Sequence, residues 1–191
     1  MNQEHHFSVK MAARLDNPGR IAELRIPELL VEVGRVKTGM VCVDLGAGTG
    51  TFTLPLAGLA GQTGKVYAVD DSRDLLDIIK GKNPPDNVDL IQADFTATGL
   101  DDAIADFCLA AFVWHETNAP EKLMAEAFRL LKPGGRLLVV EWRAEFDSPG
   151  PPQRIRIAPS RMAAMFRDTG FAEFSYLNWT QKHYYGSGLK L

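Results

Sequence analysis

The most constraining feature of this sequence is a short apolar run that leads directly into three closely spaced glycines. The run covers residues 41–45, and the glycines are Gly46, Gly48 and Gly50. Glycine adopts backbone angles that other residues avoid, and it lets a ligand touch the main chain. In open α/β sheets, ligands bind at the carboxyl ends of the strands. The pattern predicts a buried parallel strand, a ligand-binding turn and a following helix.

Other glycine-rich sites fit this turn less well. A dinucleotide site has the spacing G-x-G-x-x-G, whose third glycine would fall at position 51, where the chain has Thr51. A phosphate loop ends in Gly-Lys followed by Ser or Thr, and that ending does not occur here. Dinucleotide binding and a purely structural turn stay as the weaker alternatives.

Beyond the turn, short apolar runs alternate with segments of helical periodicity. This order predicts a parallel sheet with helices on both faces. The turn sequence Lys132-Pro133-Gly134-Gly135 stands before the fifth expected strand. The expected strands are residues 41–45, 65–69, 88–92, 105–113 and 136–142, and the expected helices are residues 51–59, 72–80 and 120–131.

The pattern changes after residue 142. A proline-rich loop at residues 147–152 leads to a helix over residues 160–169, with Ser160 as N-cap and Gly170 as the stop. Two further strands are then expected, at residues 174–177 and 183–189.

The N-terminal region carries apolar residues at helical spacing over residues 20–33, and Pro27 predicts a break and a fresh helix start there. We therefore expect an α/β fold with a doubly wound, seven-stranded, mostly parallel sheet. Residues 1–39 would form an N-terminal helical cap, and residues 40–191 the remainder of a single domain.

Composition limits the partners. The formal net charge of -3 over 191 residues disfavours a nucleic-acid partner without excluding a local basic patch. Cys42 and Cys108 lie in apolar runs and read as core residues, so neither zinc nor a disulfide is indicated. No signal peptide or membrane span is apparent, which predicts a cytoplasmic protein without membrane contact.

The glycine turn and its leading acid, Asp44-x-Gly46-x-Gly48-x-Gly50, resemble the first motif of class I S-adenosylmethionine-dependent methyltransferases. The resemblance implies a Rossmann-like methyltransferase fold. It also implies S-adenosylmethionine as cofactor and S-adenosylhomocysteine as product. In that family the loop, which here includes Ala47, wraps the methionine part of the cofactor, and the acid helps to organise its amino end.

Acids at the ends of the next two expected strands extend the resemblance. Asp70 corresponds to the acid that accepts hydrogen bonds from the ribose hydroxyls, and Asp71 competes for this role. Asp94 corresponds to the acid that accepts the adenine amino hydrogens, with Phe95 beside the ring. Ala111, in the fourth expected strand, completes the predicted cofactor contacts.

Three further segments resemble small bacterial methyltransferases of the quinone-methylase-like group. They are Leu15-Asp16-Asn17-Pro18, then Phe112-Val113-Trp114-His115-Glu116, and Glu141-Trp142 followed by Gly150-Pro151-Pro152. Many members of that group have no assigned substrate, so this narrower resemblance does not name one.

Three polar residues are the candidates for chemistry because they follow or end the fourth and fifth expected strands. His115 is a candidate general base, Glu116 a carboxylate that orients or deprotonates the acceptor, and Glu141 a substrate contact. No carboxylate cluster predicts a metal. We expect a small-molecule substrate, with a protein or RNA methyltransferase, a non-catalytic regulator and a nicotinamide oxidoreductase as alternatives. The sequence leaves a homodimer open. We also expect the N-terminal segment to fold over the site as a lid.

Overall fold

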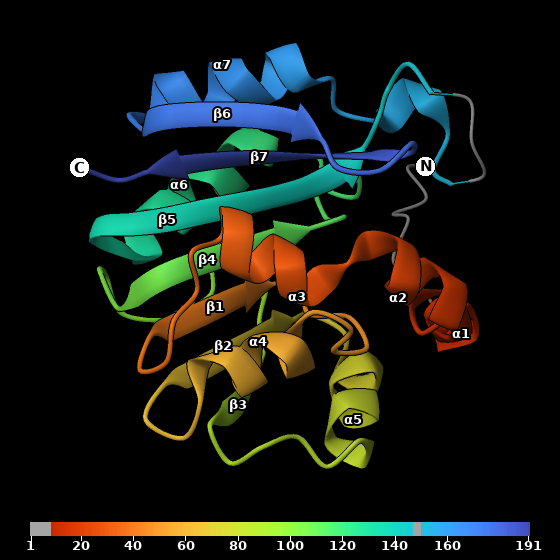
Figure 1. Ribbon diagram of the computed structural model, residues 1–191, viewed down its shortest axis with the longest axis vertical. Helices are drawn as coiled ribbons and strands as arrows, with labels where there is room; N and C mark the ends of the chain where they lie inside the picture. Colours follow the sequence, from red (N-terminus) through yellow and green to blue (C-terminus); the bar gives the residue numbers. More distant parts are fainter. Residues whose placement is uncertain (1–8, 147–149) are drawn as a thin grey trace.

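Seven strands form one sheet in the computed structural model, which describes residues 9–146 and 150–191, with side chains from Ala12 onwards (Figure 1). The strand order is β3-β2-β1-β4-β5-β7-β6. The strands are β1 (Val41–Leu45), β2 (Lys65–Asp70), β3 (Val88–Gln92), β4 (Ala105–Ala111), β5 (Leu131–Trp142), β6 (Ala172–Asn178) and β7 (His183–Leu189).

Strand direction and order confirm the predicted doubly wound, mostly parallel sheet. Strands β1 to β5 pair in parallel, whereas β7 pairs antiparallel with both β5 and β6. The chain builds outward from β1 in one direction and from β4 in the other, so the switch in strand order lies between these two strands. The glycine turn and the end of β4 therefore meet where such sheets bind ligands.

Helices cover both faces of the sheet (Figure 1). Within β1 the side chains alternate: Val43 and Leu45 pack in the cluster that holds α6 and α7, and Cys42 packs in the cluster that holds α4. Both cysteines are fully buried, as expected of core residues. The helices after β1 are α4 (Thr53–Ala60), α5 (Arg73–Gly81), α6 (Pro120–Leu130) and α7 (Pro159–Thr169), with a 3-10 turn η2 (Gln153–Ile155) before α7.

The N-terminal cap consists of α1 (Val9–Leu15), α2 (Pro18–Leu24), α3 (Ile26–Glu28) and a π-helical turn η1 (Leu29–Val33). The break that we placed at Pro27 falls at Arg25, which has a left-handed φ of 47°. Pro27 then occupies the first turn of the new helix, where its missing N–H leaves no hydrogen bond unmade. The fully buried Leu24 and Leu29 join the cap to the core on the α4 side of the sheet.

Three local predictions were wrong in detail. Ser160 is not the N-cap of α7, because the helix begins at Pro159 and Ala158 takes the capping position. The predicted turn at residues 132–135 lies inside β5 as a bulge, where the register with β4 shifts between Ala105 and Phe107. The predicted fourth strand ends at Ala111 rather than at residue 113, because Phe112 turns the chain with a φ of 63°. No helix in the described ranges is long and apolar enough to cross a membrane.

Candidate active site

The glycine turn follows β1 with all three glycines in the left-handed region that the sequence predicts. Their φ angles are 78° at Gly46, 55° at Gly48 and 83° at Gly50. The backbone N–H groups of Gly46 and Ala47 both donate to the carbonyl of Val69, at 2.9 Å. Since Val69 lies near the end of β2, these bonds hold the turn at the carboxyl edge of the sheet.

Two neighbouring segments lie so close to the turn that side chains there would not fit. A Cβ on Gly46 would overlap Cγ1 of Val113, the residue that the left-handed bend at Phe112 brings over the turn. A Cβ on Gly48 would lie 3.2 Å from Cδ1 of Leu15, at the end of α1. The turn is therefore a glycine-lined cradle between the loop after β4 and the N-terminal cap.

Asp70 connects the end of β2 to this cradle. Its Oδ2 accepts a hydrogen bond from the Gly48 N–H at 2.8 Å, and its Oδ1 accepts one from the Ser72 N–H at 3.0 Å. Burial raises the pKa of Asp70, and these two hydrogen bonds oppose the increase. Each carboxylate oxygen has further lone-pair capacity, so Asp70 can still accept hydrogen bonds from a ligand in the cradle.

Asp44 lies beneath the turn rather than on its surface. Its side chain is 1% exposed, and Oδ2 accepts a hydrogen bond from the Thr53 hydroxyl at 2.6 Å. Burial raises the pKa of Asp44 to about 7. Asp44 therefore connects β1 to the first turn of α4, and contact with the cofactor's amino end stays a prediction.

The remaining predicted cofactor residues lie at the same edge of the sheet. Asp71 and Asp94 are exposed, and Asp94 accepts hydrogen bonds from the backbone and hydroxyl of Thr96 at 2.7 and 2.8 Å. Phe95 is half-buried and lies 3.9 Å from a Cβ placed on Gly46. Ala111 pairs with Val140 at the end of β4. Phe95 is thus at the cradle, whereas the Asp94 carboxylate is held by its own loop.

His115 and Glu141 form a buried pair at the ends of β4 and β5. Nδ1 of His115 lies 3.0 Å from Oε1 of Glu141 and 3.1 Å from Oε2. The Glu141 carboxylate also accepts the backbone N–H groups of Trp114 and Trp142, at 3.0 and 2.9 Å. Glu141 is fully buried, and its carboxylate contacts His115 and these two backbone groups; its contact with a substrate stays a prediction.

The contact with Glu141 favours one tautomer of His115. A carboxylate at Nδ1 favours a proton on that nitrogen, which leaves the Nε2 lone pair of neutral His115 able to accept a proton. Burial lowers the pKa of His115, but the Glu141 carboxylate outweighs burial, and the pKa is raised. This arrangement suits a general base.

Glu116 lies between this pair and the cofactor acids. Its Oε1 is 3.7 Å from Nε2 of His115. Burial raises the pKa of Glu116 to about 7 against the opposing effect of His115. The carboxylates of Asp70 and Asp71 also raise this pKa, which places Glu116 within electrostatic range of the cradle.

Asp16, in a segment that the sequence analysis singled out, attaches the cap to the cradle through partners that the sequence did not indicate. Asp16 accepts hydrogen bonds from the hydroxyls of Thr49 and Thr51, at 2.8 and 3.1 Å. Lys82, at the end of α5, donates to Asp16 and to the Thr49 carbonyl, both at 2.7 Å. The segment Leu15-Asp16-Asn17-Pro18 was the local signal, and Asn17 is the N-cap of α2; the partners of Asp16 come from distant segments.

An aromatic cluster on the β5–β7 side of this edge was also missed. His183 packs its ring against Trp142 and Phe112, with centroid distances of 4.5 and 5.1 Å. The guanidinium of Arg20, from the cap, lies 4.8 Å from the centre of the Phe112 ring. Burial lowers the pKa of His183 to about 4, so this imidazole is neutral. The cluster anchors α2 beside the ends of the strands.

Comparisons with known proteins agree with this geometry. A family model described as a methyltransferase domain matches residues 43–139, about half of the chain. The ubiquinone/menaquinone biosynthesis C-methyltransferase UbiE of Erwinia tasmaniensis is 34% identical over 116 residues, which cover 59% of this chain and 46% of that protein. The chain spans about half the length of the curated relatives that it matches.

Solved structures give the same answer. A SAM dependent methyltransferase from Aquifex aeolicus is 25% identical with a TM-score of 0.89, over 97% of this chain and 100% of that one. Haemonchus contortus phospholethanolamine N-methyltransferase 2, solved with S-adenosylhomocysteine, shares the fold at 16% identity and a TM-score of 0.73, over 87% of this chain and 52% of that one. Because the family model matches half of the chain and the glycine cradle lies within the matched residues, this chain belongs to the methyltransferase domain family.

Proposed function

We propose that this protein transfers a methyl group from S-adenosylmethionine to a small organic molecule. The observation that carries the proposal is the cradle of left-handed glycines after β1, bonded through the Gly48 N–H to Asp70 at the end of β2. The neighbouring proteins with this fold include a SAM dependent methyltransferase and one bound to S-adenosylhomocysteine.

The residues of the cradle fit the cofactor. Glycines in the turn let a methionine moiety approach the main chain, although the positions that Cβ atoms of Gly46 and Gly48 would take are occupied by Val113 and Leu15. Asp70 is the candidate partner of the ribose hydroxyls, with Asp71 beside it. Phe95 is the candidate neighbour of the adenine ring, and Asp94, whose bonds to Thr96 both go to Oδ1, is the candidate acceptor of its amino hydrogens. When bound, S-adenosylmethionine supplies a methyl group on a positively charged sulfur.

Negative charge around the cradle favours a cationic ligand over its neutral product. Asp70, Asp71 and Glu116 lie within electrostatic range of one another, because each of the two aspartates raises the pKa of Glu116. A sulfonium placed among them would lower the free energy of their ionised forms. The attraction disappears when the sulfur loses its charge, which favours release of the product.

His115 is the proposed general base, and Glu141 is its positioning residue. Nε2 of His115 would accept the proton that the acceptor atom loses when it takes up the methyl group, while the electron pair of the broken carbon–sulfur bond stays on the sulfur. Glu141 holds the ring through Nδ1 and compensates the positive charge that the imidazole gains. Glu116, whose Oε1 lies 3.7 Å from Nε2, is the candidate residue that orients the acceptor.

The cap is proposed as part of the cofactor site. Leu15 covers Gly48, and Asp16 is bonded to the threonines that flank Gly50. Residues 1–39 would then act as a lid on a single domain; residues 1–8 lie outside those that the structure describes. A cytoplasmic location, the absence of nucleic-acid contact and a homodimer remain predictions from the sequence.

Two assays test the proposal. Isothermal titration calorimetry should detect binding of S-adenosylhomocysteine and no binding of NAD. Tight NAD binding without binding of S-adenosylhomocysteine would overturn the cofactor assignment. Incubation with methyl-labelled S-adenosylmethionine and a small-molecule extract should yield a labelled product. Cofactor binding with no transfer to any extract would instead favour a non-catalytic regulator.

A further inference from the structure

A hollow of about 270 Å³ opens beside His115, between the loop after β4 and the segment that leads into α7. Its walls come from two parts of the chain that are distant in sequence. The lining residues are Trp114, His115, Thr117, Asn118 and Pro120 on one side, and Arg154, Ile155, Arg156, Ile157 and Arg161 on the other.

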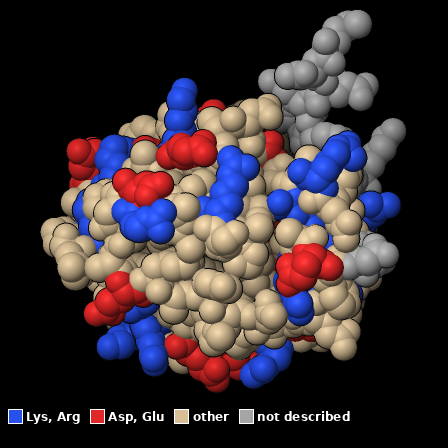
Figure 2. All heavy atoms as spheres, turned by 90° about the horizontal axis from the view of Figure 1, so that it is seen from above, with Lys and Arg blue, Asp and Glu red and all other residues tan. Residues whose placement is uncertain are grey.

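The wall of this hollow is basic although the whole chain carries a net charge of -3. Three arginines line it, and the lining residues include no carboxylate. Elsewhere on the surface acidic and basic side chains are mixed, as the face seen from above shows (Figure 2). A local excess of positive charge in an acidic protein favours an anionic ligand at this place.

The arginines are held in different ways. Arg156 is buried, and its guanidinium donates to the carbonyls of Pro151, Phe146 and Arg143 at 2.9, 2.7 and 3.1 Å, which fixes its position. Arg154 is exposed, and within the described residues no carboxylate lies at ion-pair distance from it.

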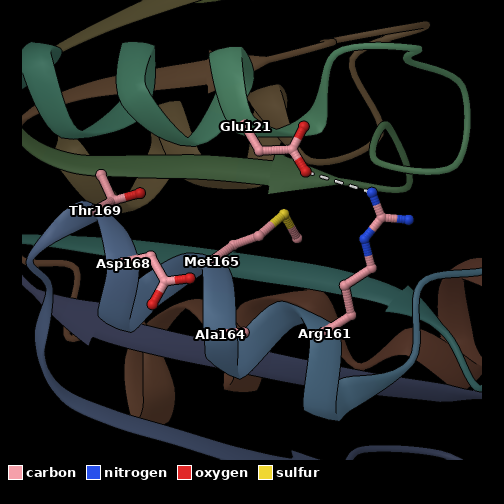
Figure 3. Close-up of a pocket in the computed structure, with 6 residues that line it drawn as sticks. All are labelled: Glu121, Arg161, Ala164, Met165, Asp168 and Thr169. Carbon is pink, nitrogen blue, oxygen red and sulfur yellow. Dashed lines mark hydrogen bonds and ion pairs between the residues drawn. The ribbon is translucent and has the colours of Figure 1, made fainter.

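Arg161 borders a second hollow between α6 and α7, where it points toward Glu121 (Figure 3). The two groups are 3.4 Å apart, and their side chains are 56% and 69% exposed. An ion pair this exposed contributes little and is easily exchanged for a better partner. Arg161 can therefore turn from Glu121 to an anion in the hollow.

The hollow is lined in part by His115, the proposed base. His115 forms part of its wall, and the same ring is held by Glu141. Arg156 lies close enough to lower the pKa of His115. Because His115 and the arginines line the same hollow, a molecule whose charged group contacts the arginines would lie beside the His115 ring.

We propose that this hollow binds a carboxylate or phosphate group of the methyl acceptor, so that the substrate is a small organic anion. The inference rests on the proposed function. Planar guanidinium groups bind such anions through paired hydrogen bonds.

The charge of the product tests the proposal. The protein is incubated with methyl-labelled S-adenosylmethionine and a small-molecule extract, and labelled products are separated by anion exchange at neutral pH. We expect the label on an anionic product, and treatment with phosphatase distinguishes a phosphate from a carboxylate. A labelled product that passes the column as a neutral or cationic molecule would overturn the inference but leave the methyltransferase intact. If calorimetry shows cofactor binding and no label is transferred, the proposed function and the inference both fail.

Substitutions of the arginines that line the hollow then test whether they bind the anionic acceptor. Arg154→Gln and Arg161→Gln should each raise the apparent KM for the anionic acceptor fraction roughly tenfold, the effect of losing one charge-assisted hydrogen bond. Arg167→Gln, which removes an exposed arginine of α7 paired only with Asp168 in the described part of the chain, is the matched control.

Glu121→Gln distinguishes the loss of the Arg161 charge from the loss of the Arg161–Glu121 ion pair, because it breaks the ion pair but keeps the guanidinium. It should leave the KM unchanged or lower it. Equal increases of KM in Arg161→Gln and Glu121→Gln, or no increase in either arginine variant, would show that the arginines do not recognise the acceptor. Binding of S-adenosylhomocysteine should be the same in all of these variants.

Discussion

The glycine cradle makes a prediction that joins stability to cofactor binding: Gly46→Ala should damage both. The substitution places a Cβ at a residue whose φ is 78°, a conformation that L side chains rarely adopt. It also places that Cβ in overlap with Cγ1 of Val113, and Cβ of Val113 lies only 3.3 Å away. Val113 is 5% exposed and packed in the core, so it cannot simply move into solvent.

Two contributions set the size of the effect. A left-handed backbone costs a residue with a side chain about 1–2 kcal/mol relative to glycine. Overpacking a well-packed site costs about 1–3 kcal/mol. Together they predict a loss of about 2–5 kcal/mol in the free energy of unfolding, a large fraction of the stability of a typical domain.

Urea unfolding and calorimetry with S-adenosylhomocysteine measure the two effects. Gly58→Ala is the matched control, because Gly58 lies inside α4 and a Cβ added there would meet no atom within 4 Å. That variant should be more stable by about 0.5–1 kcal/mol, since alanine favours the helix interior. Its affinity for S-adenosylhomocysteine should not change.

A second substitution separates overlap from backbone strain. Val113→Ala removes the atom that the new Cβ meets, so Gly46→Ala combined with Val113→Ala should be more stable than the sum of the single effects predicts, by about 1–3 kcal/mol. Wild-type stability and affinity in Gly46→Ala would refute the close approach of Val113. If the stability changes of the two single variants add exactly in the double variant, the whole effect of Gly46→Ala comes from the strained backbone and not from overlap with Val113.

Three further predictions concern the charged groups around the cradle. Glu141→Gln should lower kcat and move the acid limb of the pH profile of kcat/KM to lower pH, because the carboxylate that raises the pKa of His115 is gone; an unmoved limb would argue against His115 as base. Burial raises the pKa of Asp44 to about 7, so the folded protein binds an extra proton and loses stability as pH rises toward 7; in urea titrations Asp44→Asn should abolish this loss. Lys82→Met removes the bonds to Asp16 and should weaken S-adenosylhomocysteine binding roughly fivefold in calorimetry, near 1 kcal/mol; unchanged affinity would contradict a role for the cap.

Much of the fold was predictable because its signals are local. Alternating apolar runs and helical periodicity locate all seven strands, and the bounds of β1, β3 and β7 agree with the structure residue for residue. The glycines of the turn were predictable for the same reason, since left-handed backbone angles demand this residue type. Parallel strands end at one edge, so Asp70 could be placed beside the turn before any contact was known.

Other features depend on where distant segments meet. Glu141 could be assigned to the end of β5, but its role follows from the register that pairs Ala111 with Val140 and so brings His115 onto its carboxylate. The end of β4 at Ala111 was not predictable, because the bend at Phe112 depends on the packing of Val113 over Gly46.

The sequence by itself thus determined the elements, their order and the cofactor cradle, since periodicity and glycine chemistry act over a few residues. Only the tertiary structure decided which carboxylate contacts His115, how Asp16 holds the cap, and that Arg154 and Arg161 share a wall beside His115. These are contacts between separate segments, and they form only when the sheet sets the register and spacing of its strand ends.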